Sequence, residues 1–246
     1  GVMNTDNMTI SGETIDYGPC AFMDNYSSST VFSSIDHGGR YAYANQPEIL
    51  VWNLTRLAEA LIPLVDTKQE KAIELLTEAI TCIQPLYESY WLKEMRTKIG
   101  LSTEDPSDSQ LINDLLKIME KGNADFTLVF RRLSQVLRGD SEGVKQLFQN
   151  PFDFEHWEKR WWTRFEQEGV SGETSAQVMD NVNPIYIPRN HKVEEALSTA
   201  VETKDLIPFK KLLNAITHPF DEVSENEDYA EPAPPSDIPY RTFCGT

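Results

Sequence analysis

Apolar residues recur at three- and four-residue spacing from about residue 53 to residue 216. This is the period of an amphipathic helix that buries one face, so the pattern predicts a mainly α-helical protein. Polar and glycine-containing stretches interrupt the pattern, which indicates several helices, the last from about Leu206 to Ile216. The positions that define the others include Leu54, Leu57, Leu61 and Leu64; Ile73, Leu76, Ile80 and Ile83; Leu111, Leu115 and Ile118; Phe126, Phe130, Leu133 and Leu137; Val193, Ala196, Leu197 and Ala200.

Capping residues and helix breakers place the predicted helix ends. A Thr or Ser followed three residues later by Glu or Gln forms a capping box, and a glycine after the last turn ends a helix. Pro63 should end or kink the first helix because proline lacks an amide hydrogen. The predicted caps are Thr67 with Glu70, Ser107 with Gln110, Asp153 and Asn190, and the predicted ends are Gly100, Gly122 and Gly139.

The helix expected after Asp153 carries an aromatic stripe formed by Trp157, Trp161, Trp162 and Phe165. Aromatic side chains at helical spacing are typical of a face buried in a core. We therefore expect core packing, with a peptide-binding groove as the alternative.

The segments on either side of the helical region differ from it in composition. Residues 15–47 are rich in Gly, Ser, Asp, Asn and Tyr and predict an ordered, loop-rich segment. Residues 221–240 contain seven acidic residues, four prolines and no Lys or Arg, which predicts an extended tail. The predicted parts are thus a loop-rich segment at 1–47, a helical region at 48–219 and an acidic tail at 220–246.

Charge and composition narrow the function. The 39 acidic and 22 basic residues give a net charge of -17, which argues against a nucleic-acid or anionic-membrane surface. No apolar run approaches the roughly 20 residues that cross a bilayer, so we expect a soluble protein. Cys20, Cys82 and Cys244 lie far apart, without zinc-ligand or disulfide-framework spacing, which favours a reducing compartment.

The first eighteen residues hold the densest chemistry. Asp6 and Asn7 precede a turn at Ser11-Gly12, and an Asp16-Tyr17-Gly18 triplet follows it. The apolar residues on both sides of this turn predict a short β-hairpin with acidic groups at both bases. Converging carboxylate and amide oxygens suit a hard cation such as Mg²⁺.

From the residues alone, two interpretations of this segment stay open. Asp and Asn commonly cap turns without any further role. Alternatively, kinases hold metal ions with an Asn and the Asp of an Asp-Phe-Gly triplet, and an Asp five residues before the Asn is the base. Asn7 and Asp16 match the two metal ligands, but Val2 stands at the position of the base. Asp6 is the nearest substitute.

Several motifs of the chain resemble those of the SelO family (selenoprotein O, YdiU in bacteria), a pseudokinase-like group of protein adenylyltransferases. The resemblance covers nearly the whole chain. The motifs are Gly-Val-Met-Asn-Thr-Asp-Asn-Met at 1–8 with Ile-Asp-Tyr-Gly-Pro at 15–19, Gly-Arg-Tyr-Ala-Tyr at 39–43 with Asn-Gln-Pro at 45–47, Trp-Asn-Leu at 52–54 with Arg-Leu-Ala at 56–58, and Asn-Pro at 183–184 with Ile-Pro-Arg-Asn-His at 187–191.

The resemblance implies transfer of AMP from ATP to Ser, Thr or Tyr hydroxyls of proteins, with release of pyrophosphate and dependence on Mg²⁺ or Mn²⁺. Asp6 matches the family's proton acceptor, and Asn7 and Asp16 match its metal ligands, with Asp16 beside the nucleotide. Bacterial members are linked to UMP transfer from UTP, so the nucleotide stays open. The implied fold is the helical C-terminal lobe of a protein-kinase-like fold, with the metal-binding hairpin and a helical C-terminal extension.

The chain begins at Gly1, without an initiator Met, so we expect it to be a C-terminal portion of a longer protein. The family's nucleotide-binding lobe would precede it, and the isolated chain should be inactive or very weak. The expected location is cytoplasmic for a bacterial member and mitochondrial for a eukaryotic one. The sequence does not indicate which oligomeric state the protein has.

Four further residues are candidates for function. Arg40 follows two glycines and could reach a phosphate, although an Arg at a loop end more commonly pairs with an acidic neighbour. Arg189 is expected to be structural, and His191 shows no metal-ligand spacing with other histidines. Cys244 occupies the neighbourhood of the family's C-terminal redox cysteine, and an exposed thiol favours reaction. A disulfide partner within the chain could only be Cys20 or Cys82.

The sequence therefore leaves three hypotheses about function open. The first is the helical part of a protein nucleotidyltransferase. The second is a phosphoryl-transferring kinase, against which Val2 argues. The third is a non-catalytic helical interaction domain in which the first eighteen residues only form turns.

Overall fold

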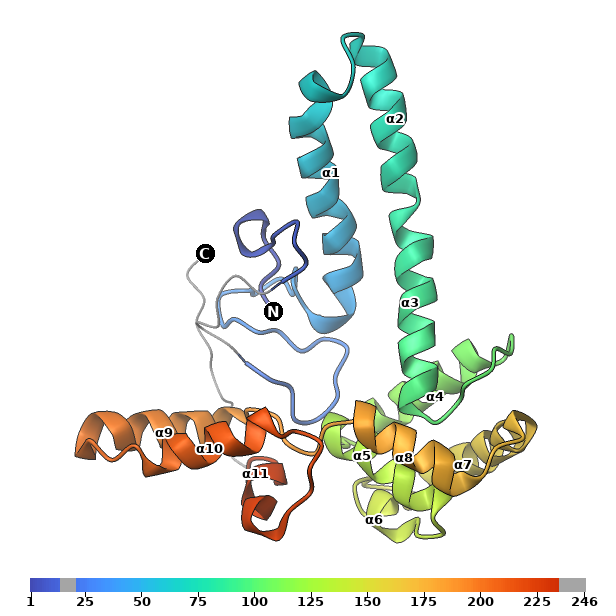
Figure 1. The fold of residues 1–246 in the computed structure, drawn as a ribbon, viewed down its shortest axis with the longest axis vertical. Helices are drawn as coiled ribbons and strands as arrows, with labels where there is room; N and C mark the ends of the chain where they lie inside the picture. The colour runs from blue at the N-terminus through green and yellow to red at the C-terminus, as the bar shows by residue number, and fades with distance from the viewer. Residues whose placement is uncertain (14–20, 235–246) are drawn as a thin grey trace. The chain divides into compact units, whose positions relative to one another are not determined.

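The computed structural model of the protein describes residues 1–13 and 21–234. Helices connected by loops dominate these residues, as the apolar spacing predicts (Figure 1). Their contacts group them into two compact units. The first contains residues 1–13, 21 and 28–91, and the second contains residues 22–27 and 92–234.

The predicted β-hairpin is not confirmed. Thr5–Asn7 form a 3-10 helix, η1, and no strand occurs within residues 1–13, while the second arm expected after Gly12 lies outside the described residues. In the described part of the chain, β pairing is limited to one isolated bridge between Asn25 and Asp125. The fold class established here is mainly α, and the kinase-like assignment stays a prediction.

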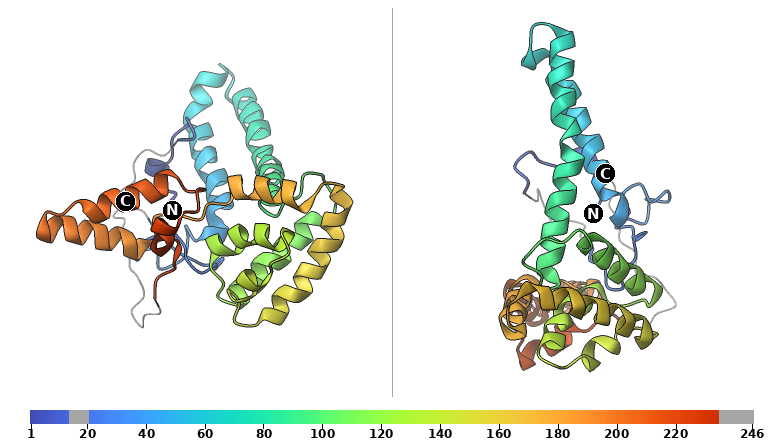
Figure 2. Two further views of the ribbon diagram at one scale, coloured as in Figure 1. Left: turned by 60° about the horizontal axis from the view of Figure 1, so that its bottom comes forward. Right: turned by 90° about the vertical axis from the view of Figure 1, so that its right-hand side faces the viewer.

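A helical hairpin forms most of the first unit. After the 3-10 helix η2 (Tyr43–Asn45), helix α1 (Gln46–Val65) packs against α2 (Gln69–Thr81), and the two run in opposite directions (Figures 1 and 2). Helix α3 (Ile83–Lys98) continues from α2 after Cys82. Its residues up to 91 belong to the first unit and the remainder to the second.

The buried face of α1 differs from the predicted one. Ile49, Asn53 and Ala58 are buried, whereas Leu64 is 80% exposed. The predicted leucine stripe is therefore wrong as a core face. The helix starts earlier than expected, with Pro47 in its first turn, where a missing amide hydrogen costs nothing.

Helices of the second unit pack in pairs. Helix α4 (Asp108–Lys121) contacts α7 (Pro151–Phe165), α5 (Phe126–Leu137) contacts α8 (Gly172–Val182), and α9 (Asn190–Thr203) contacts α10 (Ile207–Thr217). The α9–α10 pair forms a second helical hairpin (Figure 2). The short α6 (Glu142–Lys145) and the 3-10 helix η3 (Glu166–Glu168) complete this arrangement.

Helix α8 is missing from the sequence-based prediction because it carries few large apolar residues. Ala176 and Met179 are its fully buried apolar positions. It approaches α5 closely at Gly172, where an added Cβ would lie 2.7 Å from the carbonyl oxygen of Leu137. The available signal was Ser171, whose side chain accepts from the amide of Thr174 and caps the helix.

The aromatic stripe of α7 is core packing, as predicted. Trp157 and Trp161 are buried, and their rings stack with centroids 5.5 Å apart. Each indole nitrogen donates to a carbonyl oxygen, from Trp157 to Leu111 at 2.8 Å and from Trp161 to Ile99 at 2.9 Å. Because these rings and their polar atoms are buried and paired, the peptide-groove alternative is wrong.

None of the four predicted caps forms its expected side-chain hydrogen bonds, because each side chain, or a neighbour, has another partner. Asp153 lies inside α7, whose N-cap is Asn150, and its carboxylate accepts from Lys121 at 2.7 Å. At α2 the N-cap is Lys68, whose amide donates to Asp66, so Thr67 and Glu70 form no capping box. Ser107 is the N-cap of α4, at the predicted position, but its hydroxyl donates to Asp105 and caps no amide of the helix. Asn190 is already inside α9, and its amide pairs with the backbone of residue 22.

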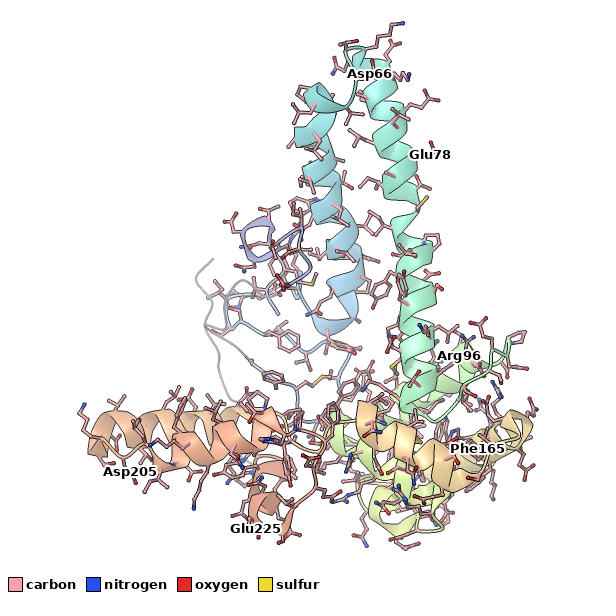
Figure 3. All side chains as sticks on the ribbon, in the orientation of Figure 1. Asp66, Glu78, Arg96, Phe165, Asp205 and Glu225 are labelled. Atoms are coloured by element: carbon pink, nitrogen blue, oxygen red, sulfur yellow. The ribbon has the colours of Figure 1, made fainter. Side chains whose placement is uncertain are left out.

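A network of buried charges joins α3, α4 and α7. Arg96, at the C-terminal end of α3 (Figure 3), donates to Asp108 at 2.7 Å. Arg164 donates to the other oxygen of Asp108 at 2.7 Å and to Glu168 at 2.7 Å. The Asp108 and Glu168 side chains are fully buried, so burial of these charges depends on their arginine partners.

The acidic segment after Pro219 is folded in its first part. It forms the 3-10 helix η4 (Ser224–Asn226) and α11 (Glu227–Ala230), with Asn226 and Ala230 buried. The hydroxyl of Tyr186 accepts from the amide of Val223 at 3.0 Å and donates to its carbonyl at 3.1 Å. Tertiary hydrogen bonds thus order a segment that its composition alone predicts to be extended.

None of the helices in the described ranges combines the length and apolarity needed to span a bilayer.

Candidate functional site

A short loop around η1 carries two of the predicted site residues. The side-chain oxygen of Asn4 accepts from the amides of Asp6 and Asn7, each at 3.1 Å, and caps the 3-10 helix. The Asn7 side-chain nitrogen donates to the carbonyl oxygen of Val2 at 2.9 Å, which closes the loop. We name residues 2–8 the Asp6 loop. Its internal hydrogen bonds fix the backbone at the site.

Asp6 and Asn7 stand on the exposed side of this loop. The Thr5 hydroxyl lies 3.4 Å from Asp6 Oδ1, to which it donates. An exposed carboxylate on a fixed backbone is accessible to an incoming hydroxyl group. Val2 is buried, so the residue that replaces the usual kinase base is part of the packing and not of the exposed surface.

The Asp6 loop is attached to α1 through Asn53. The Asn53 side-chain nitrogen donates to the carbonyl oxygen of Met3 at 2.7 Å and lies 2.7 Å from the sulfur of Met8. Sequence reasoning did not single out Asn53 as a site residue. The available signal was a polar side chain four residues after Ile49 on the face of α1 that is buried.

A cavity of about 290 Å³ separates part of the loop from α1. Its lining from the loop side is Thr5, Met8, Thr9 and Ile10, and its lining from the helix is Asn53, Leu54, Arg56 and Leu57. Half of these side chains are apolar, namely Met8, Ile10, Leu54 and Leu57.

The donor chemistry of the Asp6 loop fits a hard cation. In proteins Mg²⁺ binds one or two carboxylate or amide oxygens, and water and phosphate oxygens supply its other ligands. The hydrogen bond from Asn7 Nδ2 to Val2 orients the amide, and its oxygen is the atom type that binds such cations. Within the described ranges, no group of three or more His, Cys, Asp or Glu residues could hold a metal. The third predicted ligand, Asp16, lies outside those ranges.

Arg40 stacks on aromatic rings. Its guanidinium carbon lies 4.8 Å from the ring centroid of Trp52 and 5.7 Å from that of Tyr41. Arg56 approaches Trp52 as well, at 5.3 Å. Among the described residues no ion pair joins the side chain of Arg40 to an acidic neighbour, and Asp36 accepts from its backbone amide instead. The expected pairing with an acid is replaced by a cation–π contact.

Arg189 is structural, as the sequence suggests. It is fully buried, and Nη1 donates to Asp24 and Asp125 at 2.6 Å each, while Nη2 donates to the carbonyl oxygen of Ala230 at 2.8 Å. Burial lowers the pKa of this guanidinium, but the hydrogen bonds with the two carboxylates outweigh it and raise the pKa above its ordinary value. The neighbouring His191 has its pKa lowered by burial.

Of the three cysteines, Cys82 is exposed with a free thiol. Cys20 and Cys244 lie outside the described residues, so the predicted redox site stays a prediction.

Comparisons with known proteins agree on what this chain is similar to. Residues 1–217 match the sequence model of the family described as Protein adenylyltransferase SelO. Over its whole length the chain is similar to proteins named Protein nucleotidyltransferase YdiU. It is 54% identical over 246 residues to that of Geobacillus kaustophilus (strain HTA426) and 50% identical over 247 residues to that of Alkaliphilus metalliredigens (strain QYMF). Each match covers 100% of this chain and 50% or 49% of the relative, so the chain spans about half the length of the curated relatives it matches.

Proposed function

Because the chain belongs to the SelO family, we propose that it supplies the catalytic loop of an enzyme that transfers a nucleoside monophosphate to protein hydroxyl groups. The observation that carries the proposal is the exposed Asp6 next to Asn7 on a loop whose backbone is fixed by Asn4. The acceptors are Ser, Thr or Tyr side chains of protein substrates.

Asp6 acts as the proton acceptor in this proposal. It takes the proton of the acceptor hydroxyl as the oxygen attacks the α-phosphorus of the nucleoside triphosphate. The new bond joins that oxygen to the α-phosphorus, and the bond from the α-phosphorus to the bridging oxygen of the β-phosphate breaks. Pyrophosphate leaves with the electron pair of that bond. No other carboxylate of the Asp6 loop is available for this role.

Asn7 and Asp16 would hold a divalent cation, Mg²⁺ or Mn²⁺. Such an ion, when bound, neutralises negative charge on the phosphates and on the departing pyrophosphate. The role of Asn7 is supported by the oriented amide on the Asp6 loop. The role of Asp16 rests on its match to the family motif.

The nucleotide-binding lobe is proposed to lie in a region outside this chain, since the chain spans about half the length of its relatives. The isolated 246-residue chain should then bind ATP with Mg²⁺ too weakly to detect by calorimetry. Clear micromolar binding would contradict this part of the proposal. The helical region and the Asp6 loop would form the C-terminal lobe of a kinase-like fold.

One experiment separates the candidate functions. The full-length protein is incubated with ATP or UTP, a divalent metal and candidate substrate proteins, and intact masses of the products are measured. Addition of AMP or UMP supports nucleotidyl transfer and identifies the nucleotide, while addition of a phosphate supports a kinase. No addition under any condition favours a non-catalytic helical domain. Replacing Asp16 by Ala should abolish the transfer and its metal dependence; retained activity would remove the proposed metal role.

A cytoplasmic location is proposed for a bacterial protein of this type, and Cys244 is proposed as a redox-active thiol. Mass mapping of the oxidised full-length protein under non-reducing conditions tests the thiol. If Cys244 stays free, an intramolecular disulfide at this position is excluded.

A further inference from the structure

Asn53 is a polar residue on the buried face of an amphipathic helix. Its exposed fraction is 6%, and it lies on α1 between the buried positions Ile49 and Ala58. A buried amide destabilises a fold unless its polar atoms are hydrogen-bonded. For Asn53, Oδ1 has no hydrogen-bond partner among the described residues, so the contacts of the side chain come from its nitrogen.

That nitrogen contacts both ends of the Asp6 loop. It donates to the carbonyl oxygen of Met3 and lies against the sulfur of Met8, each at 2.7 Å. Met3 precedes the capping residue Asn4, and Met8 follows Asn7. Because a carbonyl oxygen can only accept, the amide of Asn53 must present its nitrogen to Met3. A single side chain of α1 thus contacts the backbone before the two site residues and the side chain of Met8 after them.

Beside Asn53, few side chains of the Asp6 loop pack directly against α1. The cavity of about 290 Å³ lies between Thr5, Met8, Thr9 and Ile10 on the loop side and the surface of α1 that includes Asn53. A loop over a cavity is not wedged in position by van der Waals contacts. Beside the buried Val2 and a longer hydrogen bond from Gln46 of α1 to the carbonyl oxygen of Gly1, at 3.4 Å, the hydrogen bond from Asn53 at 2.7 Å is the contact that holds the loop on α1 next to the site residues.

We propose that Asn53 is a positioning residue for nucleotidyl transfer, which acts by fixing the carbonyl group of Met3 and thereby the place of Asp6 and Asn7. The inference rests on the proposed function of the Asp6 loop. A proton acceptor must come within about 2.6–3.2 Å of the hydroxyl that it serves. Loss of the anchor lets the loop move over the cavity, so the chemical step slows, while nucleotide binding by other parts of the protein is little affected.

Two variants of the full-length protein test this role. Asn53→Leu removes the donor at similar volume, and Asn53→Asp keeps the shape and replaces the donor by an acceptor. Both should lower kcat by roughly 10- to 100-fold, as expected for loss of a positioning contact, with the KM for the nucleotide changed less than threefold. In hydrogen–deuterium exchange, a peptide covering residues 2–10 should exchange faster in both variants.

Asn183→Leu is the matched control. Asn183 is also a buried asparagine whose side-chain nitrogen donates to a carbonyl oxygen, that of Lys98 at 2.8 Å, and it lies in the second unit. The Asn183→Leu variant should be less stable than the parent protein, but its kcat should not fall selectively and its amide hydrogens in residues 2–10 should not exchange faster. Circular dichroism is the measurement that checks whether each variant is folded at the assay temperature.

The outcomes separate this inference from the proposed function. If Asp6→Asn abolishes transfer and the folded Asn53 variants keep kcat within twofold of the parent protein, the positioning role is wrong and the site assignment stands. If Asn183→Leu lowers kcat as much as Asn53→Leu does, the effect is general destabilisation and the inference fails. If Asp6→Asn leaves transfer unchanged, the site assignment itself is wrong.

Discussion

Arg189 donates to both oxygens of Asp125, from Nη1 at 2.6 Å and from Nη2 at 3.2 Å, in a fully buried ion pair. Asp125 is also the N-cap of α5, where Oδ1 accepts from the amide of Leu128 at 2.8 Å. The pair therefore connects the residue before α9 to the first turn of α5, within the second unit. Its two partners are separated by 64 positions in the sequence.

Replacing Arg189 by Met should destabilise the second unit strongly. The variant keeps an apolar side chain of similar length but leaves the buried Asp125 carboxylate without its cation, which costs about 3–5 kcal/mol in comparable proteins. Urea denaturation of the chain measures the free energy of unfolding. Arg160→Met, which breaks the exposed pair with Asp114, is the control and should cost about 1 kcal/mol or less.

A second substitution tests whether the unpaired charge is the cause. Asn at position 125 is neutral and still accepts from the amide of Leu128, so Asp125→Asn should recover part of the stability lost in Arg189→Met. If the double variant is as unstable as the two single losses added together, the uncompensated charge is not what destabilises Arg189→Met.

Acidification should destabilise the second unit through Glu168. Burial would raise the pKa of this carboxyl group, but hydrogen bonds from Ser102, Thr103 and Arg164 outweigh it and lower the pKa from 4.5 to about 2. Because the unfolded chain binds the proton first, the stabilisation is present above about pH 4.5 and is lost as the pH falls toward 2. For this buried group the total effect is on the order of 3 kcal/mol.

Glu168→Gln should remove this part of the pH dependence, which lies between the pKa of 4.5 in the unfolded chain and the pKa of about 2 in the folded protein. The measurement is the urea midpoint as a function of pH. Glu166→Gln, on the exposed side of the same 3-10 helix, should leave the profile unchanged. An identical acid dependence in Glu168→Gln and the parent protein would show that other carboxyl groups determine it.

Gly172→Ala should destabilise the contact between α8 and α5. The new Cβ would lie 2.7 Å from the carbonyl oxygen of Leu137, and a backbone atom cannot move aside as a flexible side chain does. We expect a loss of about 1–3 kcal/mol, the range for overpacking, measured by thermal or urea unfolding.

Gly143→Ala is the matched control for this substitution. Gly143 lies in α6, where the closest atom to an added Cβ is Arg132 Cδ at 4.0 Å. Alanine favours a helix more than glycine does, so this variant should be neutral or slightly more stable. If the Gly172→Ala variant is as stable as Gly143→Ala, helices α5 and α8 can move apart to accept the methyl group without a loss of stability.

Asp6→Asn should reduce nucleotidyl transfer by the full-length protein by roughly 10²- to 10⁴-fold, the contribution typical of a positioned proton acceptor. The amide keeps the size of the side chain but cannot take up a proton at neutral pH. Transfer of labelled nucleotide to a substrate protein is the measurement. Asp66→Asn, at the turn between α1 and α2 (Figure 3), changes charge equally in the same unit and should leave the rate unchanged.

The residues of the candidate site were accessible from the sequence to different degrees. Asp6, Asn7 and Asp16 are predicted from a motif whose members are close in the chain, and the family resemblance rests on this motif together with those at 39–47, 52–58 and 183–191. The loop geometry is partly local as well, since Asn4 caps the amides of Asp6 and Asn7 two and three residues later. Asn53 is different, because its partner Met3 is 50 positions away and no local pattern indicates that pairing.

The same division applies to the fold. The sequence by itself determined that the chain is mainly helical, that helices end near Gly122 and Gly139, and that Trp157 and Trp161 of α7 are buried. Each of these follows from side-chain spacing or backbone preference within a few residues. The tertiary structure alone decided that Leu64 is exposed, that Arg189 is buried between Asp24 and Asp125, and that residues 224–230 are folded. The reason is physical: local energies fix where a helix forms, whereas burial of a charge or an amide depends on partners that only the folded chain brings within hydrogen-bond distance.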